Sequence, residues 1–471
     1  MSTELIDITY LIVPDKDATF LNEKEWLELY ETCLQLMAEF MNNNPKIISE
    51  PEFDDIFDEN IQELLYAHFE SNIFYNEEAE DELEEVIEHA KTDFFTHHFQ
   101  PRSYPDTCIL KEPNYKEIKQ TLRILKAKPQ PDQRTKEWYE FRHNLITASN
   151  AYKAFENQPT KNQLIYEKCQ PINNDNDCSK EIVLVNTNTT LHWGQKYEPL
   201  SVKIYEHIYE TKVDDFGCIQ HDVYKFLGAS PDGINVDVKS KRYGRMLEIK
   251  NIVNREIDGI PKKEYWIQMQ IQMEVCGLDE CDFLETRFTE YSDHQSFISD
   301  ANEMEFEDED GNDFTNVCLS KEDKMKGIMI YFHTKEGKPF YVYKPLEYIH
   351  PQDILAWEEK TLNLYQSAEY GYIYMKFIYW KLDQMSCVLV PRNKEWFKNN
   401  VWEIEDIWAT IKKERKDGYE HRAPNRRIKK ENAFEIMTKS ANNHCLLQLD
   451  KLTGKITIIK KDIDNNQFLE S

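Results

Sequence analysis

The residues with the clearest potential for chemistry are two acids and a lysine in one short part of the chain. Asp232 lies in the turn sequence Ser-Pro-Asp-Gly, and Glu248 and Lys250 follow it in a short apolar run. In a strand, alternate side chains share a face, so Glu248 and Lys250 point one way while Leu247 and Ile249 point into the core. The pattern predicts a strand with one charged face and one packed face.

A hairpin at the Pro-Asp-Gly turn would bring Asp232 and Glu248 together. Two carboxylates with open positions beside them suit Mg²⁺ or Mn²⁺, which keep several waters and accept phosphate oxygens. Lys250 beside such a metal would orient or deprotonate a water and stabilise the charge that grows on a phosphodiester. The alternative is a surface hairpin with an incidental salt bridge.

Glu198 and two glutamines are further candidates on flanking helices. Glu198 precedes Pro199 near the expected start of a helix, since proline is tolerated in a first turn or at a kink. It is either a helix-dipole partner or a third carboxylate facing the metal site. The run 261–278 has helical period, with Gln268 and Gln272 on one stripe. They bond either to the site or to a neighbouring loop.

A possible phosphate pocket is indicated further towards the N-terminus. A helix starts near Thr135 and carries Arg142, and Thr147 and Ser149 are placed to cap the helix that follows. Exposed helix amides beside an arginine bind phosphate. The alternative is a capped helix with a surface arginine. A second candidate for phosphate contacts is the segment 411–430, with nine Lys or Arg against three acids, or else it is a solvated basic tail.

Composition bounds the class of protein. The chain has 471 residues, of which 40% are hydrophobic and 13% aromatic, so two or three packed domains are expected. No apolar run approaches ~20 residues and no signal peptide is evident, which predicts a soluble intracellular protein without a membrane partner. The net charge of −29 argues against general affinity for nucleic acid but allows a local basic groove.

The ten cysteines form no C-x-x-C pair, which favours reduced core thiols over zinc or an iron-sulfur cluster. The periodicity predicts a helical N-terminal domain and a mixed central core, followed by a helical extension whose aromatic residues, from Tyr370 to Trp408, belong to its packing. The expected boundaries are 1–115 for the helical domain, 116–134 for a linker, 135–345 for the core with an acidic loop at 300–313, 346–430 for the helical, aromatic-rich extension, and 431–471 for a tail.

Five sequence blocks in order resemble the PD-(D/E)XK nuclease core of the lambda-exonuclease, or YqaJ viral recombinase, family. They are Trp138–Ser149, Gly194–Glu198, Ser230–Gly233, Leu247–Lys250 and Tyr265–Gln270. The resemblance covers about residues 130–290 and is closest to versions found in large DNA viruses. It implies an α/β (α+β) restriction-endonuclease-like fold, a central mixed sheet flanked by helices.

The resemblance also implies roles for individual residues. Asp232 and Glu248 would bind Mg²⁺ or Mn²⁺ together with the backbone carbonyl of Ile249, and Lys250 would activate water. Glu198 matches the helix acid that supports the metal, and Gln268 matches a glutamine beside the lysine. The positions that hold a 5′ phosphate are matched by Arg142, Ser149 and Ser230, with Thr147 as an alternative to Ser149.

The implied function is metal-dependent hydrolysis of DNA, commonly 5′ to 3′ resection of duplex ends, in recombination, repair or viral genome processing. A structure-specific endonuclease and a non-catalytic DNA-binding scaffold of the same fold are the alternatives. The implied partner is DNA, with a single-strand annealing or replication protein as a further candidate. If the chain is viral, the expected location is host cytoplasm or virus factory.

Overall fold

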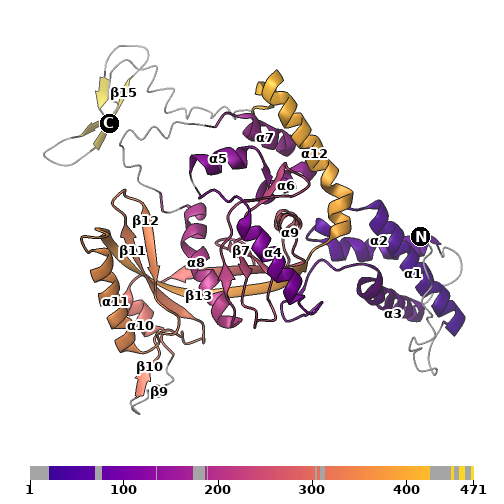
Figure 1. Cartoon of the computed structure of the whole chain (residues 1–471), viewed down its shortest axis with the longest axis horizontal. Helices are drawn as coiled ribbons and strands as arrows, with labels where there is room; N and C mark the ends of the chain where they lie inside the picture. The colour runs from indigo at the N-terminus through magenta and orange to yellow at the C-terminus, as the bar shows by residue number, and fades with distance from the viewer. Residues whose placement is uncertain are drawn as a thin grey trace. The chain divides into compact units, whose positions relative to one another are not determined.

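The structure is a computed structural model that describes residues 21–68, 77–133, 135–172, 186–187, 189–302, 305–307, 313–424, 447–449, 456–461 and 468–470. The chain divides into two units, 1–420 and 421–471. The second unit contributes three short antiparallel strands, β14 (Leu447–Leu449), β15 (Ile456–Lys461) and β16 (Phe468–Glu470). The 3₁₀ turn Glu420–Arg422 spans the boundary, and all other elements described below belong to the first unit (Figure 1).

The N-terminal part is helical, as the sequence predicts. It contains α1 (Glu23–Asn43), α2 (Phe53–His68) and α3 (Glu77–Asp93), followed by a π-helical turn, Phe94–His98. Asn22 and Glu25 form a reciprocal capping box at the start of α1. Phe53, Phe57 and Phe94 are buried between the helices and belong to a core cluster that continues into the rest of the unit.

A mixed central sheet organises the first unit. Its strand order is β12-β11-β13-β8-β7-β6-β3, and β1 (Tyr104–Pro105) pairs with β13. The only parallel pair along this order is β7 with β8, and helix α9 (Lys263–Cys276) forms the crossover between them. The strands are β3 (Val213–Asp214), β6 (Gly233–Asn235), β7 (Met246–Asn251), β8 (Glu280–Glu290), β11 (Lys326–His333), β12 (Pro339–Tyr343) and β13 (Ile373–Pro391). The mixed sheet flanked by helices confirms the predicted fold class.

A small second sheet and several helices cover the centre. The sheet has the order β2-β5-β4, with β2 (Ile146–Thr147), β5 (Leu227–Ala229) and β4 (Ile219–Gln220). The helices are α5 (Lys136–His143), α6 (Ala148–Ala151) with a 3₁₀ turn at Tyr152–Phe155, α7 (Gln158–Cys169) and α8 (Thr190–Ile208). Helix α6 packs closely on α9, and α8 packs on β7.

Two expectations about secondary structure were wrong. The expected linker 116–134 contains helix α4 (Tyr115–Ala127), whose buried Leu122 and Leu125 attach it to the unit, so only its end is proline-rich. The region expected to be helical from 351 to 416 contains the 19-residue strand β13 between helices α11 (Pro351–Tyr365) and α12 (Lys394–Asp417). In β13 the buried residues alternate, as at Ile378, Trp380 and Leu382, which is the period of a strand.

Helix α8 also begins earlier than expected. Thr189 caps it by accepting a hydrogen bond from the backbone N–H of His192, so Pro199 lies inside the helix and Glu198 is not in its first turn. A helix-dipole role for Glu198 is therefore excluded, because that effect is confined to the first turn. Tyr197, Leu200 and Ile204 keep this helix on the sheet despite the proline.

Other predictions concern residues at the edge of the described chain. The acidic loop includes a short antiparallel pair, β9 (Glu305–Glu307) and β10 (Asp313–Thr315), and residues 308–312 lie outside the described residues. The basic segment is described only to residue 424, with its first part in α12. A short helix, α10 (His294–Ser299), and a 3₁₀ turn, Glu420–Arg422, complete the elements. Eight cysteines are described, and all are free thiols. None of the helices in the described part is long and apolar enough to cross a membrane.

Candidate active site

The predicted hairpin exists and brings the acids together. Strands β6 and β7 are antiparallel, with Gly233 opposite Leu247. One carboxylate oxygen of Asp232, Oδ2, accepts a hydrogen bond of 2.8 Å from the backbone N–H of Ile249. Gly233 is needed here because a Cβ at this position would lie 2.1 Å from Cγ1 of Val213 on β3. The turn therefore fixes Asp232 over the middle of β7.

Glu248 is held by three donors. Its Oε1 accepts hydrogen bonds from the Lys250 ammonium and from Gln268, the latter at 2.7 Å, and its Oε2 accepts one of 2.7 Å from Gln272. Gln268 and Gln272 lie one turn apart on α9, so the helix that connects β7 to β8 also supplies the amides. The polar stripe predicted on that helix thus faces the site. Gln272 belongs to this stripe, although it had no assigned role in the site predicted from the sequence.

The charged face of β7 is not a solvent-exposed face. Glu248 has no exposed surface, whereas Leu247 and Ile249 are buried on the opposite side as predicted. The expectation of one charged and one packed face was therefore incomplete, because α9 covers the charged side. A buried carboxylate needs this many hydrogen bonds to offset its lost hydration.

Electrostatic repulsion among the acids marks the site. Burial, and then the carboxylate of Glu248, raise the pKa of Asp232 well above its ordinary value, although Lys250 and the Ile249 N–H act in the opposite direction. Burial would lower the pKa of Lys250, but Glu248 and Asp232 outweigh it and raise that pKa. The arrangement concentrates negative charge that the single ammonium only partly balances.

Glu198 joins this cluster from α8. Its side chain is accessible to solvent, but protein atoms crowd its carboxyl group, and this desolvation followed by the charge of Glu248 raises its pKa. Asp215, just after β3, raises it further and was not identified from the sequence. A single Asp next to a two-residue strand belongs to no motif, so the sequence does not indicate that it lies near the site.

The residue types fit a divalent cation. The carboxylates of Asp232, Glu248 and Glu198 and the carbonyl of Ile249 are the hard oxygen donors that Mg²⁺ and Mn²⁺ prefer, and a cation would relieve the repulsion that raises the pKa values. As the side chains stand, no three His, Cys, Asp or Glu residues in the described ranges are close enough to form a metal cluster. The oxygens of Glu248 are instead bonded to Lys250 and the two glutamines.

A group of cations lies near the second predicted site. Burial raises the pKa of the Cys218 thiol, and Arg142 and Ser230 lie close enough to this thiol to act in the opposite direction, so these two residues from α5 and the end of β5 are neighbours. The ammonium of Lys168, on α7, donates to the backbone carbonyl of Arg142 at 2.8 Å. Burial, together with the charges of Arg142 and Arg415, lowers the pKa of Lys168 to about 8.

Arg415 from α12 ties this group together. Its Nη2 donates to the carbonyls of His143 and Lys168, both at 2.7 Å, and its Nη1 donates to Oδ1 of Asn144 at 3.2 Å. Within the described residues, Arg142, Lys168 and Arg415 form no ion pair with a carboxylate. Neither Lys168 nor Arg415 was predicted for the site, since they come from helices distant in sequence and carry no motif.

Ser149 differs from its expected place. It lies inside the short helix α6, its side chain is exposed, and its hydroxyl is 3.3 Å from that of Thr147. Thr147 occupies the N-cap position without a side-chain cap bond. No hydrogen bond joins either residue to Arg142 or Ser230 in the described chain, so the structure brings together two of the three predicted phosphate ligands.

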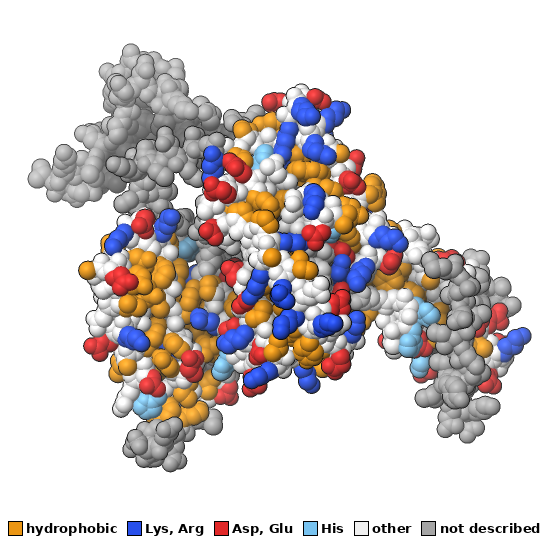
Figure 2. Space-filling model, viewed as in Figure 1, with side chains coloured by type: hydrophobic (Ala, Val, Ile, Leu, Met, Phe, Trp, Pro, Cys, Tyr) orange, Lys and Arg blue, Asp and Glu red, His pale blue; other side chains and the backbone are white. Residues whose placement is uncertain are grey.

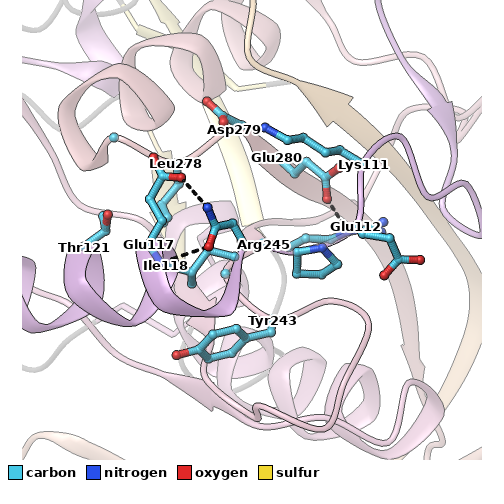
Figure 3. Close-up of a pocket in the computed structure, with 14 residues that line it drawn as sticks. Lys111, Glu112, Glu117, Ile118, Thr121, Tyr243, Arg245, Leu278, Asp279 and Glu280 are labelled. Carbon is cyan, nitrogen blue, oxygen red and sulfur yellow. Dashed lines mark hydrogen bonds and ion pairs between the residues drawn. The ribbon is translucent and has the colours of Figure 1, made fainter.

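Basic side chains also gather on α4. Its outward face carries Lys116, Lys119, Arg123 and Lys126, and Figure 2 shows Lys and Arg side chains concentrated around the centre of this view. Beside α4 is a pocket of about 90 Å³, where Arg245 pairs with Glu280 close to Glu117 and Tyr243 (Figure 3). None of the predicted site residues lines this pocket.

These observations define the class of the protein: an α/β domain in which a hairpin, a crossover helix and α8 gather three carboxylates, a lysine and two glutamines. Residues 137–279 match the model of the YqaJ-like viral recombinase domain. This match agrees with the resemblance seen in the five sequence blocks.

Two kinds of relative complete the comparison. An uncharacterized protein of Acanthamoeba polyphaga mimivirus is 29% identical over 326 residues, which are 64% of this chain and 56% of that protein. The chain thus spans little more than half the length of this relative. Among solved structures, an alkaline exonuclease from Laribacter hongkongensis, LHK-Exo, is 18% identical over 61% of this chain and 95% of its own, with a TM-score of 0.31. LHK-Exo in complex with dAMP is 17% identical over 60% and 94%, also at 0.31.

Proposed function

We propose that the protein is a metal-dependent deoxyribonuclease that degrades duplex DNA from its ends in the 5′ to 3′ direction. The observation that carries the proposal is the buried Glu248, bonded to Lys250, Gln268 and Gln272 and facing Asp232. A purely structural ion pair would not need two further acids, Asp232 and Glu198, whose pKa values are raised by burial and by the charge of Glu248. The match to the YqaJ-like domain supports the same chemistry.

Each residue has a role in this proposal. Asp232, Glu248, Glu198 and the carbonyl of Ile249 hold a divalent cation, Mg²⁺ or Mn²⁺. When bound, the cation neutralises charge on the scissile phosphate and lowers the pKa of water. Lys250 orients the attacking water and stabilises the negative charge on the phosphate oxygens. Gln268 and Gln272 keep Glu248 in place as positioning residues.

The cationic group supplies the end recognition. Arg142 and Ser230 bind the 5′ phosphate in the proposal, and Lys168 adds a third contact that the sequence did not suggest. Arg142, Lys168 and the neighbouring Arg415 have no carboxylate partner in the described chain, so together they favour an anion. Ser149 takes part only if the helix that carries it moves, so we assign the pocket to Arg142, Ser230 and Lys168.

The substrate test uses purified full-length protein with Mg²⁺ and linear, nicked and closed-circular duplexes. We expect degradation of the linear duplex, faster with 5′ phosphate than with 5′ hydroxyl ends. Equal cleavage of the closed circle would favour the endonuclease alternative, and binding without cleavage in Mg²⁺ or Mn²⁺ would favour the scaffold. Retained activity in Lys250→Ala would show that the site is wrongly assigned.

The cellular role that we propose follows from the product of this reaction. Resection from a 5′ end leaves a single strand with a 3′ end, which recombination, repair or viral genome processing can use. A single-strand annealing or replication protein is the partner that would consume this product. Pull-down of such a protein together with resected DNA would test the partnership.

A further inference from the structure

A second cavity lies beside the candidate active site and has a different lining. It has a volume of about 270 Å³, and the side chains that define it are Trp193 and Lys196 from α8, Tyr331 from β11, Tyr341 from β12 and Lys376 from β13. Its volume is close to the ~300 Å³ at the lower end of small-molecule pockets. The cavity is therefore large enough for one flat ring system with its attached sugar.

The aromatic rings form a surface for stacking. Tyr331 and Tyr341 lie nearly parallel, with ring centroids 4.9 Å apart and an interplanar angle of 18°. The Lys196 ammonium lies 4.3 Å from the centroid of Trp193 and forms an ion pair with Glu290, so this lysine is already neutralised. The rings are thus held in place before any ligand arrives.

Lys376 supplies a free charge at the edge of the cavity. Its side chain is exposed and forms no ion pair with any described carboxylate. It is close enough to Lys196 for its charge to lower the pKa of that residue. Stacking rings next to an unpaired cation are the combination with which proteins bind single nucleotides of a DNA strand, the rings to a base and the cation to a phosphate.

The cavity is adjacent to the catalytic residues. Trp193 and Lys196 share α8 with Glu198, and Val253, which also lines the cavity, follows Lys250 at the exit of β7. The Tyr343 hydroxyl donates to the carbonyl of Lys196 at 2.6 Å, and its ring is near enough to Glu198 to be affected by its charge. The wall of the cavity and the wall of the active site are therefore one continuous structure.

The strand order sets the direction. In the sheet, β7 with Glu248 and Lys250 lies between β6, which follows Ser230, and the β13-β11-β12 edge that carries the cavity. The cationic group of Arg142 and Lys168 is on the Ser230 side. A strand whose 5′ phosphate binds there and whose scissile phosphate reaches β7 continues towards the cavity (Figure 1).

We propose that this cavity binds the nucleobase on the 3′ side of the scissile phosphate, stacked on Trp193 and Tyr341, with Lys376 on the following phosphate, while the buried Tyr331 supports Tyr341 from below. The proposal rests on the proposed function, since it requires a DNA strand at β7. It adds a base-binding subsite that positions the strand for the next cleavage. Because stacking accepts every base, the subsite holds the strand without reading its sequence.

Photo-crosslinking tests the subsite directly. A 5′-phosphorylated duplex carries 5-iodo-deoxyuridine as the second nucleotide of the cleaved strand, and a control duplex carries it far from both ends. The full-length protein binds each duplex without divalent metal, and the crosslinked peptide is identified by mass spectrometry. We expect crosslinks to Trp193 or Tyr341 from the first duplex only. Crosslinks that map elsewhere, or none, would overturn the proposal.

Matched variants provide an independent measurement. Trp193→Ala should weaken binding of the end-positioned duplex by roughly 5- to 100-fold, the range for loss of one stacked base, while Trp193→Phe retains most of it. Lys376→Gln, an exposed substitution without risk to folding, should weaken binding several-fold. The controls Trp402→Ala on α12 and Lys338→Gln on the β11–β12 connection replace an exposed tryptophan and an exposed lysine outside the cavity and should bind as the parent protein does.

The same protein is also assayed for cleavage in Mg²⁺ and in Mn²⁺. Cleavage of linear DNA without crosslinks in the cavity, or with unchanged binding in Lys376→Gln, would reject the subsite and leave the nuclease proposal standing. If the parent protein neither cleaves nor binds DNA, the nuclease proposal itself is rejected.

Discussion

Replacement of Asp232 by Asn should make the protein more stable while it abolishes cleavage. The pKa of Asp232 is raised because its carboxyl group is buried and faces Glu248 and Glu198. An acid whose pKa is higher in the folded chain holds its proton more tightly there, so its ionised form destabilises the fold. Asparagine removes the charge, and its Oδ1 still accepts the hydrogen bond from the Ile249 N–H.

The expected gain in the free energy of unfolding is about 1–2 kcal/mol, the usual size of a stabilising change at a strained functional site. This gain is absent below the ordinary pKa of aspartate, ~3.9, because residue 232 is then neutral in both the parent protein and the variant. It grows as the pH rises and levels off above the raised pKa of folded Asp232. If the parent protein binds the cation as proposed, added Mg²⁺ should stabilise it and reduce the difference.

Denaturant unfolding in EDTA at several pH values between 4 and 8 measures the effect. The matched control is Asp258→Asn, because Asp258 also accepts a backbone hydrogen bond, from Ile260 at 2.9 Å, but is exposed. This control should change stability by less than ~0.5 kcal/mol. A destabilised Asp232→Asn at pH 8, or a gain of equal size at pH 4 and pH 8, would refute the electrostatic reasoning.

Three further predictions concern end recognition, DNA affinity and the turn. Lys168 has a pKa of about 8 and loses its charge above that pH, so preference for 5′-phosphorylated ends should fall between pH 7 and pH 9 in paired cleavage assays, and Lys168→Arg should keep it. An unchanged pH profile in Lys168→Arg would contradict this role. Replacing Lys116 and Lys119 on α4 by Gln should reduce the slope of log K against log salt by about 2 if both contact phosphates, and an unaltered slope would place DNA elsewhere. Gly233→Ala should lower the free energy of unfolding by about 1–3 kcal/mol through the clash with Val213, and the double variant with Val213→Ala should recover part of that loss.

The sequence predicted the parts of the site that depend on local pattern. Asp232, Glu248 and Lys250 lie on one turn and one strand, so their relation follows from the hairpin and the strand period. The glutamine stripe of α9 was visible as polar residues at helical spacing on an apolar helix. In each case neighbouring positions in the chain were enough to set the direction of the side chains.

The local sequence pattern did not predict the correct secondary structure where the same residues are compatible with two different elements. Strand β13 is rich in Tyr, Phe and Trp, which suit both a buried helix and a strand, and pairing with both β8 and β11 decides between them. Helix α8 starts before Pro199 because Thr189 provides an N-cap and Tyr197 and Leu200 pack on the sheet. The Thr189 cap is local, but the strand pairing and the packing on the sheet come from residues far away in the chain.

Tertiary structure alone decided how the site is charged and closed. The sequence determined that two acids and a lysine meet on a hairpin, within a region that matches the model of the YqaJ-like viral recombinase domain. Only the packing of α9 on β7 buries Glu248, and only the meeting of α5, α7 and α12 gathers Arg142, Lys168 and Arg415. Burial and charge coupling depend on distances across the fold, and no spacing along the sequence specifies those distances.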